Sequence, residues 1–243
     1  MSLTPARRHM QRYAAMAQSQ KRESQRDTTA WERMCHRLHQ DKKRLKGIQS
    51  NERKAELKRQ LLPDYQGWID GVLAADTGRP DDVFVTCMIW TIDTGQIDAA
   101  LPLAAYVLRH NLPLPDTYQR TPAALIVEEI CNPALLAIKL DEHARPLPAA
   151  LLKQVEALTR HADMPDPVRA KLCKLLGLTL RHDTPDAWPQ ALGYLLRAMA
   201  LNAGAGVKRE IEILRRQIAK NPDAQQGREH EPPAVDASAS AAG

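Results

Sequence analysis

The stretch that decides the fold is LLPDYQGWIDGVLAADTGRPDDVFVTCMIWTIDTGQIDAAL, residues 61–101. It is the densest apolar part of the chain, and it holds two of the four tryptophans and the only phenylalanine. Apolar residues recur at helical spacing on both sides of a break at 77–80. Pro80 followed by two aspartates predicts a helix start, and Thr94-Gly95 predicts its end. We therefore expect a central hairpin of two short helices, each burying one tryptophan.

The sequence beyond this hairpin continues the helical pattern as far as residue 220. Glycine is scarce and no alternating apolar–polar run is sustained, so the chain is predicted to be all-α. Residues 93–101 and 183–192 are similar to each other, and each precedes an Ala/Leu-rich helix, which suggests a helical-repeat-like C-terminal bundle. The expected helices span 96–111, 121–143 with an interruption near 132–133, 148–161, 166–181, 188–201 and 206–220.

The N-terminal side carries a long helical region from 29 to 62. Thr29 and Glu32 have capping-box spacing at its start, Gly47 is expected to split it, and Asn51 is expected to cap the second half. This organisation predicts three parts. They are basic DNA-binding and oligomerisation helices at 1–62, a helical body at 63–220, and a disordered tail at 221–243.

An imperfect heptad pattern runs along the region 29–62. Such a seam is typical of helix–helix or subunit contacts. The residues predicted to make contacts between subunits are Trp31, Met34, Leu38, Leu45 and Ile48.

Positive charge is concentrated at the N-terminus. The whole chain has a net charge of +5, but residues 1–60 hold 16 Lys and Arg against 6 Asp and Glu, and the remainder is net acidic. A basic segment on an acidic body indicates a polyanionic partner for that segment, with an ordinary solvated face as the alternative. The predicted DNA-binding residues are Arg7, Arg8, Arg12, Lys21, Arg22, Lys42, Lys43, Arg44 and Lys46.

A second hypothesis is that carboxylates form a metal-dependent nuclease site. Such a site needs carboxylates that converge on Mg²⁺, whereas adjacent residues of one helix point in different directions. Helix capping explains the first pair better. The candidate catalytic residues are Asp81, Asp82, Asp93, Glu128 and Glu129.

No other chemistry is indicated. Cys35 and His39 could face one ion, but zinc needs three or four ligands, so no metal site is predicted. The sequence lacks a phosphate-binding GxxxxGK[ST] loop, so no ATPase activity and no cofactor are expected, and Mg²⁺ only for a nuclease. The longest apolar runs fall short of a membrane span, so no membrane partner is expected.

Several short stretches resemble a known family, and they occur in the family's order. The chain is similar to the gpM-type small terminase subunits of temperate contractile-tailed phages, over about residues 4–220. The family often ends in a basic tail, whereas residues 225–243 are nearly neutral here. The stretches are TPARRH (4–9), LLP (61–63), WI-x-GVL (68–73), WTIDTG (90–95), RTP (120–122), ADMPD (162–166), VRAKL (168–172) and AGVK (205–208).

This resemblance implies a role in viral genome packaging. Small terminase subunits bind double-stranded phage DNA at the packaging site, here the cohesive-end site, and recruit a large subunit that carries the ATPase motor. The resemblance therefore implies that the helical body at 63–220 docks this motor. They usually assemble as homo-oligomeric rings, and they act in the host cytoplasm. The family is also described as an endonuclease subunit. We interpret this chain as directing a cut that the large subunit makes, with two alternatives: that it is itself the nuclease, or that it is a protein-only helical scaffold.

Overall fold

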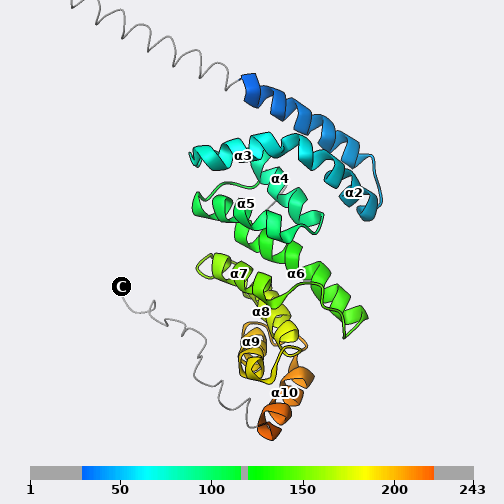
Figure 1. Cartoon of the computed structure of the whole chain (residues 1–243), viewed down its shortest axis with the longest axis vertical. Coiled ribbons are helices and arrows are strands. Elements are labelled where there is room, and N and C mark those ends of the chain that lie inside the picture. The colour runs from blue at the N-terminus through cyan, green and yellow to red at the C-terminus, as the bar shows by residue number, and fades with distance from the viewer. Residues whose placement is uncertain (1–28, 116–119, 222–243) are drawn as a thin grey trace, which may run out of the picture.

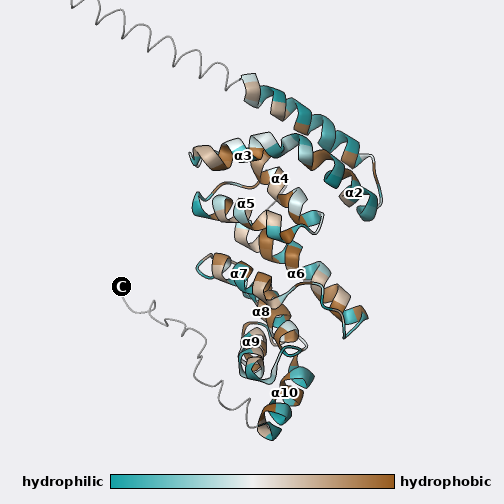
Figure 2. Cartoon of the chain, in the orientation of Figure 1, coloured by the Kyte–Doolittle hydropathy of each residue, from teal (hydrophilic) through white to brown (hydrophobic). Residues whose placement is uncertain are grey.

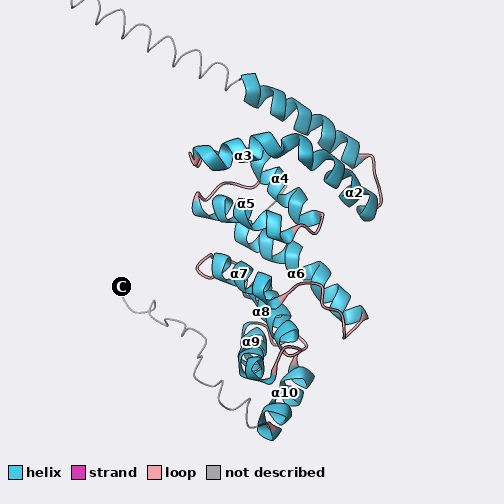
Figure 3. Cartoon of the chain, viewed as in Figure 1, coloured by secondary structure: helices cyan, strands magenta, loops and turns pink. Residues whose placement is uncertain are grey.

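The computed structural model describes residues 29–115 and 120–221, and every regular element within them is helical (Figures 1 and 3). The helices stack along one long axis, with residues 29–46 at one end and α10 at the other. The prediction of an all-α fold is confirmed. The elements after residues 29–46 are α2 (Asn51–Leu61), η1 (Leu62–Tyr65), α3 (Gln66–Ala75), α4 (Asp82–Asp93), α5 (Ile97–Arg109), α6 (Pro122–Leu140), α7 (Ala149–Thr159), α8 (Asp166–Leu180), η2 (Pro185–Ala187), α9 (Trp188–Leu201) and α10 (Lys208–Lys220).

Helix α4 is the centre of the core. All ten residues from Val83 to Ile92 are buried, as expected for a helix that is apolar on every side and packed between other helices (Figure 2). The helix begins where the sequence predicted, because a carboxylate oxygen of Asp81 accepts a hydrogen bond from the backbone N–H of Phe84 at 3.0 Å. It ends at the predicted turn, where Gly95 adopts a φ of 78° that favours glycine.

The two central tryptophans are not equally buried. Trp90 is 5% exposed and packs edge-on against Tyr65, with ring centroids 6.0 Å apart. Trp68 is only half-buried, so the expectation of one buried tryptophan in each helix is wrong for α3. The reason is its indole N–H, which donates a 2.8 Å hydrogen bond to Asp81 and holds the ring over the first turn of α4.

Helix α6 begins as predicted but is not interrupted. The Thr121 side chain accepts from the backbone N–H of Ala124, and Pro122 occupies the first helical position. The helix then continues through Pro133 to Leu140, so the expected break at 132–133 is wrong. Pro133 is solvent-exposed, and water can therefore bond the carbonyl that loses its N–H partner.

The N-terminal helical region is divided as expected. Residues 29–46 are helical, Gly47 forms a turn, and α2 follows. The N-cap of α2 is Ser50 rather than Asn51, because the Ser50 hydroxyl accepts from the backbone N–H of Arg53 at 3.3 Å. The predicted cap at Thr29 is at the limit of the described residues, so its geometry is not tested.

One large apolar core joins the N-terminal helices to the body. Leu38 and Leu45 pack in the same cluster as α4, and α2, η1 and α3 follow one another without a loop. A smaller cluster lies between α8, α9 and α10. No loop therefore separates the elements on either side of residue 62, and the predicted tail at 221–243 lies outside the described residues except for Asn221.

Two further features of the described residues are the length of the apolar helices and the state of the cysteines. None of these helices is long and apolar enough to span a bilayer. All four cysteines are free; Cys87, Cys131 and Cys173 are buried and Cys35 is half-buried. Burial raises the pKa of the Cys87 and Cys131 thiols to about 12, so these groups stay protonated and inert at neutral pH.

Candidate nucleic-acid interface and a neighbouring groove

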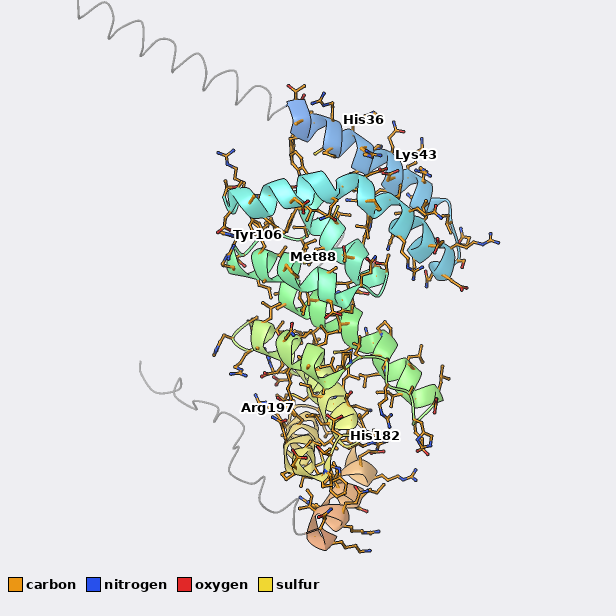
Figure 4. All side chains as sticks on the ribbon, in the orientation of Figure 1. His36, Lys43, Met88, Tyr106, His182 and Arg197 are labelled. Carbon is orange, nitrogen blue, oxygen red and sulfur yellow. The ribbon has the colours of Figure 1, made fainter. Side chains whose placement is uncertain are left out.

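The helix at residues 29–46 exposes lysines to solvent, and Lys43 lies on the outer side of the helical stack (Figure 4). Lys42, Lys43 and Lys46 are exposed, and none of them has an ion-pair or hydrogen-bond partner in the described part of the chain. Leu38 and Leu45 of the same helix pack in the core and so fix the orientation of the helix. Three uncompensated ammonium groups on a rigid helix are suited to contact phosphates.

Arg44 differs from these lysines because its charge is partly neutralised. Its guanidinium lies 3.1 Å from Asp41, which is 5% exposed and also accepts a 2.8 Å hydrogen bond from the hydroxyl of Tyr65. Burial, together with this bond to Asp41, raises the pKa of Tyr65 above its ordinary value. Arg44 is therefore held by Asp41, and we expect it to contribute less to an external contact.

The cationic surface continues into α2, which the sequence reasoning did not include. Arg53 is exposed and Lys54 half-buried, and neither has an acidic partner among the described residues. Their neighbours Lys58 and Arg59 pair with Asp93 and Glu56. The sequence shows four cationic residues within 53–59, but only the folded structure shows which of them lack an acidic partner among the described residues. The predicted contacts Arg7, Arg8, Arg12, Lys21 and Arg22 lie outside the described residues.

In the first pair of candidate catalytic carboxylates, Asp81 caps helix α4. Asp81 is 8% exposed and accepts hydrogen bonds from the indole of Trp68 and the backbone of Phe84. Asp82 is exposed in the first turn of the same helix. Asp93 lies at the opposite end of α4, about 16 Å away along the axis at 1.5 Å per residue. The three aspartates are therefore not brought together.

The second pair shares Arg120 as a partner but differs in its other neighbours. Glu128 forms ion pairs with Arg120 and with Lys171, the latter at 2.8 Å. The hydrogen bond from Lys171, together with that from Arg120, lowers the pKa of Glu128. Glu129 lies 3.5 Å from Arg120, and burial, with the nearby charge of Asp93, raises its pKa. Adjacent carboxylates thus occupy opposite electrostatic environments.

A groove of about 570 Å³ opens beside the cationic surface. Lys54 and Lys58 of α2 line one side, and Glu129 of α6 lines another, with Asp93 between. Apolar residues complete it, including Ala55, Ile92, Ile97, Ile130, Pro133, Ala134 and Leu147.

The groove brings Asp93 and Glu129 together, but each has a cation beside it, Lys58 and Arg120 respectively. Within the described residues, no group of three or more His, Cys, Asp or Glu side chains could hold a metal ion. A two-metal site needs several converging carboxylates, and the five candidates are dispersed over three places.

The predicted oligomerisation residues also fall into different environments. Leu38 and Leu45 are buried in the core of their own chain, and Met34 and Ile48 are half-buried. Trp31 is 45% exposed. Of this set, Trp31 presents the most apolar surface to a second molecule.

Together, these features define an all-α protein with an uncompensated cationic helix at one end and a mixed apolar and charged groove beside it. Sequence comparison assigns the family. The family described as Phage small terminase subunit matches residues 35–167, which include the exposed lysines of the cationic helix and all residues that line the groove. The chain belongs to the phage small terminase subunit family.

Two curated relatives support this assignment. The chain is 42% identical over 223 residues to the terminase, endonuclease subunit of Escherichia phage P2, with 91% of this chain and 88% of that protein covered. It is 25% identical over 206 residues to the probable terminase, endonuclease subunit of Haemophilus phage HP1 (strain HP1c1), covering 79% and 72%. No solved structure matches the chain.

Proposed function

We propose that this chain binds double-stranded phage DNA at the packaging site, the cohesive-end site, and recruits or directs a large terminase subunit that cuts and packages the genome. The observation that carries this proposal is the set of exposed lysines on the helix at 29–46, which have no ion-pair or hydrogen-bond partner among the described residues. Membership of the small terminase subunit family suggests that the polyanion bound by this surface is phage DNA. We place this activity in the host cytoplasm and expect a homo-oligomer, such as a ring, as the working form.

The cationic surface is suited to phosphates more than to bases. Ammonium groups act as point charges, whereas base readout relies on bidentate guanidinium or amide groups. Of the arginines Arg44 and Arg53 on this surface, Arg44 is already bound by Asp41, and the ammonium groups of Lys42, Lys43 and Lys46 outnumber the remaining guanidinium of Arg53. We therefore propose that this surface sets affinity and register, and that it does so through counterion release.

A mobility-shift titration at several salt concentrations tests the proposal. The variant replaces Lys42, Lys43 and Lys46 with glutamate, and its matched control makes the same charge change at Lys208, Arg209 and Arg215 on α10. Each lost phosphate contact should reduce the salt slope by about 0.9, so the slope should fall by about 3 for the helix 29–46 variant. Equal effects of both variants, or no effect of either, would overturn the assignment of DNA binding to this helix.

A second candidate function is that the chain itself cleaves DNA. It is favoured by Asp93 and Glu129 lining one groove, and by the names of both relatives. Purified protein would then nick site-bearing duplex with Mg²⁺ in the absence of a large subunit. Asp93→Asn and Glu129→Gln would abolish nicking, whereas Asp82→Asn, distant from the groove, would not.

The protein-only scaffold remains a third outcome of the same assays. It predicts retained binding to the large subunit but no mobility shift of duplex DNA even at low salt. That combination would remove the DNA-binding proposal and leave the docking part intact.

A further inference from the structure

Among the described residues, the large apolar side chains exposed to solvent are Ile213 of α10 and those of two further features. One is Trp31, which is 45% exposed near the start of the described chain. The other is a stripe on α6, where Leu136 and Leu140 are 56% and 80% exposed. Spacings of three and four residues place both leucines on the same helix face as Pro133. Since Pro133 lines the groove, the stripe extends the apolar wall of the groove to the end of α6.

The polar groups of the groove match the residues around Trp31. The carboxylates of Asp93 and Glu129 can accept a hydrogen bond from an indole N–H, and Lys54 lacks an acidic partner in the described chain. Trp31 is followed by Glu32 and Arg33, both exposed and without a described ion pair. Glu32 complements Lys54 in charge, and Arg33 complements Glu129.

We propose that Trp31 of one copy inserts into the α2–α4–α6 groove of a second copy of this chain. This proposal rests on the homo-oligomer that the proposed function includes, and it names the residues through which two copies would meet. The volume of the groove, about 570 Å³, is within the range of pockets that bind drug-sized ligands, so the groove has room for an indole side chain. An aromatic side chain buries at most about 250 Å², so a stable interface of about 1,200 Å² or more must also cover the stripe at Leu136 and Leu140.

The contact must form between copies rather than within one chain. Trp31 and Lys46 are separated by 15 residues of helix, or about 22 Å at 1.5 Å per residue. The groove lies next to α2, which starts just beyond that far end (Figure 1). Because the rigid helix keeps the two apart, a chain cannot fill its own groove.

A contact between two different patches is heterologous. Repeated head-to-tail, such a contact generates a ring if the rotation closes and a filament if it does not. This property distinguishes the proposal from a two-fold contact in which Trp31 meets Trp31 along the heptad seam.

The test uses two complementary variants of the full chain, studied by light scattering after size-exclusion chromatography. Trp31→Ala removes the inserted side chain, and Pro133→Arg places a long charged side chain in the groove from an exposed position. Each should weaken self-association at least tenfold. Mixed together, they retain one intact Trp31 and one intact groove per pair, so the mixture should form dimers and nothing larger. Ile213→Ala removes an exposed apolar side chain from α10 and serves as the matched control.

A charge exchange covers the case in which either variant fails to fold. Glu32→Lys and Lys54→Glu should each weaken assembly, and the double variant should restore it. Wild-type assembly that survives Trp31→Ala, or a mixture that stays monomeric, would overturn the insertion while leaving the homo-oligomer intact. Wild-type protein that is monomeric at every concentration would remove both. The mobility-shift assay tests the DNA-binding proposal independently of these assembly measurements.

Discussion

Nε2 of His110 lies 2.7 Å from a carboxylate oxygen of Asp76, and this contact ties the loop after α3 to the end of α5. The same loop is held by a 2.9 Å hydrogen bond from the backbone N–H of Gly78 to the hydroxyl of Tyr106. The rings of Tyr106 and His110 pack with centroids 4.5 Å apart. This cluster fixes the chain just before it enters α4, so the position of the central helix depends on it.

Gly78→Ala should destabilise the protein through this cluster. Gly78 has a φ of +64°, and an added Cβ would lie 2.4 Å from Nδ1 of His110. The left-handed backbone alone costs about 1–2 kcal/mol for a non-glycine residue, and the clash adds to it. Thermal unfolding should show a clear loss. Gly67→Ala is the control, because its Cβ meets nothing within 4 Å on α3 and alanine favours a helix, so that variant should be as stable as wild type or slightly more stable.

The Asp76 contact should also make the protein sensitive to acid. The hydrogen bond from His110, assisted by Arg109, lowers the pKa of Asp76 in the folded state. A lowered folded pKa means that the stabilisation is present above the ordinary aspartate pKa of about 4 and is lost as the pH falls through the folded value. Denaturant unfolding between pH 5 and pH 2 should show a shallower loss for Asp76→Asn than for wild type. Equal slopes would contradict the assignment.

The neighbours Glu128 and Glu129 should respond oppositely to the same substitution. Glu128→Gln removes the charged partner of Lys171 and Arg120, and hydrogen bonds to charged groups contribute about 1.5–3 kcal/mol. The pKa of Glu129 is raised, so the folded state disfavours its charge, and Glu129→Gln should be neutral or stabilising at pH 7. Denaturant unfolding at pH 7 and pH 4 distinguishes the two, since the pKa directions predict that the Glu128 contribution fades as the pH falls.

The sequence predicted the helices well because their limits depend on local chemistry. Asp81 and Thr121 are caps whose side chains bond backbone groups three residues away, and such signals can be recognised without a fold. The break predicted at Pro133 was wrong because the effect of a proline depends on which side of the helix it occupies, and exposure is a property of the folded protein.

The candidate site was less predictable because neutralisation is a long-range property. The pairing of Arg44 with Asp41 is local, three residues apart on one helix, but the hydrogen bond from the Tyr65 hydroxyl that also holds Asp41 comes from a distant part of the chain. The pairing of Lys58 with Asp93 joins residues that are far apart in the chain. The groove likewise combines residues from α2, α4 and α6, whose approach no local pattern indicates.

Asp81 and Asp82 provide a test of the structural interpretation against the catalytic one. Asp81→Ala removes an N-cap and leaves the indole N–H of Trp68 without its acceptor, and loss of a cap alone costs about 0.5–2 kcal/mol. Asp82→Ala changes an exposed residue and should stay within about 0.5 kcal/mol. Urea unfolding of both variants separates the roles, and an unaffected Asp81→Ala would remove the capping explanation.

The packing of α8 on α9 gives the last prediction. An added Cβ at Gly177 would lie 2.6 Å from two carbons of the Leu195 side chain and 3.0 Å from the carbonyl oxygen of Ala191. Leu195 is fully buried, so it has little room to move, and Gly177→Ala should cost about 1–3 kcal/mol by overpacking despite the better helix propensity of alanine. Gly71→Ala, whose Cβ meets nothing within 4 Å on α3, isolates the propensity effect. Adding Leu195→Ala to Gly177→Ala should recover part of the loss in a double-mutant cycle, because the smaller side chain makes room for the new methyl group. A Gly177→Ala variant as stable as Gly71→Ala would show that the two helices can separate without cost.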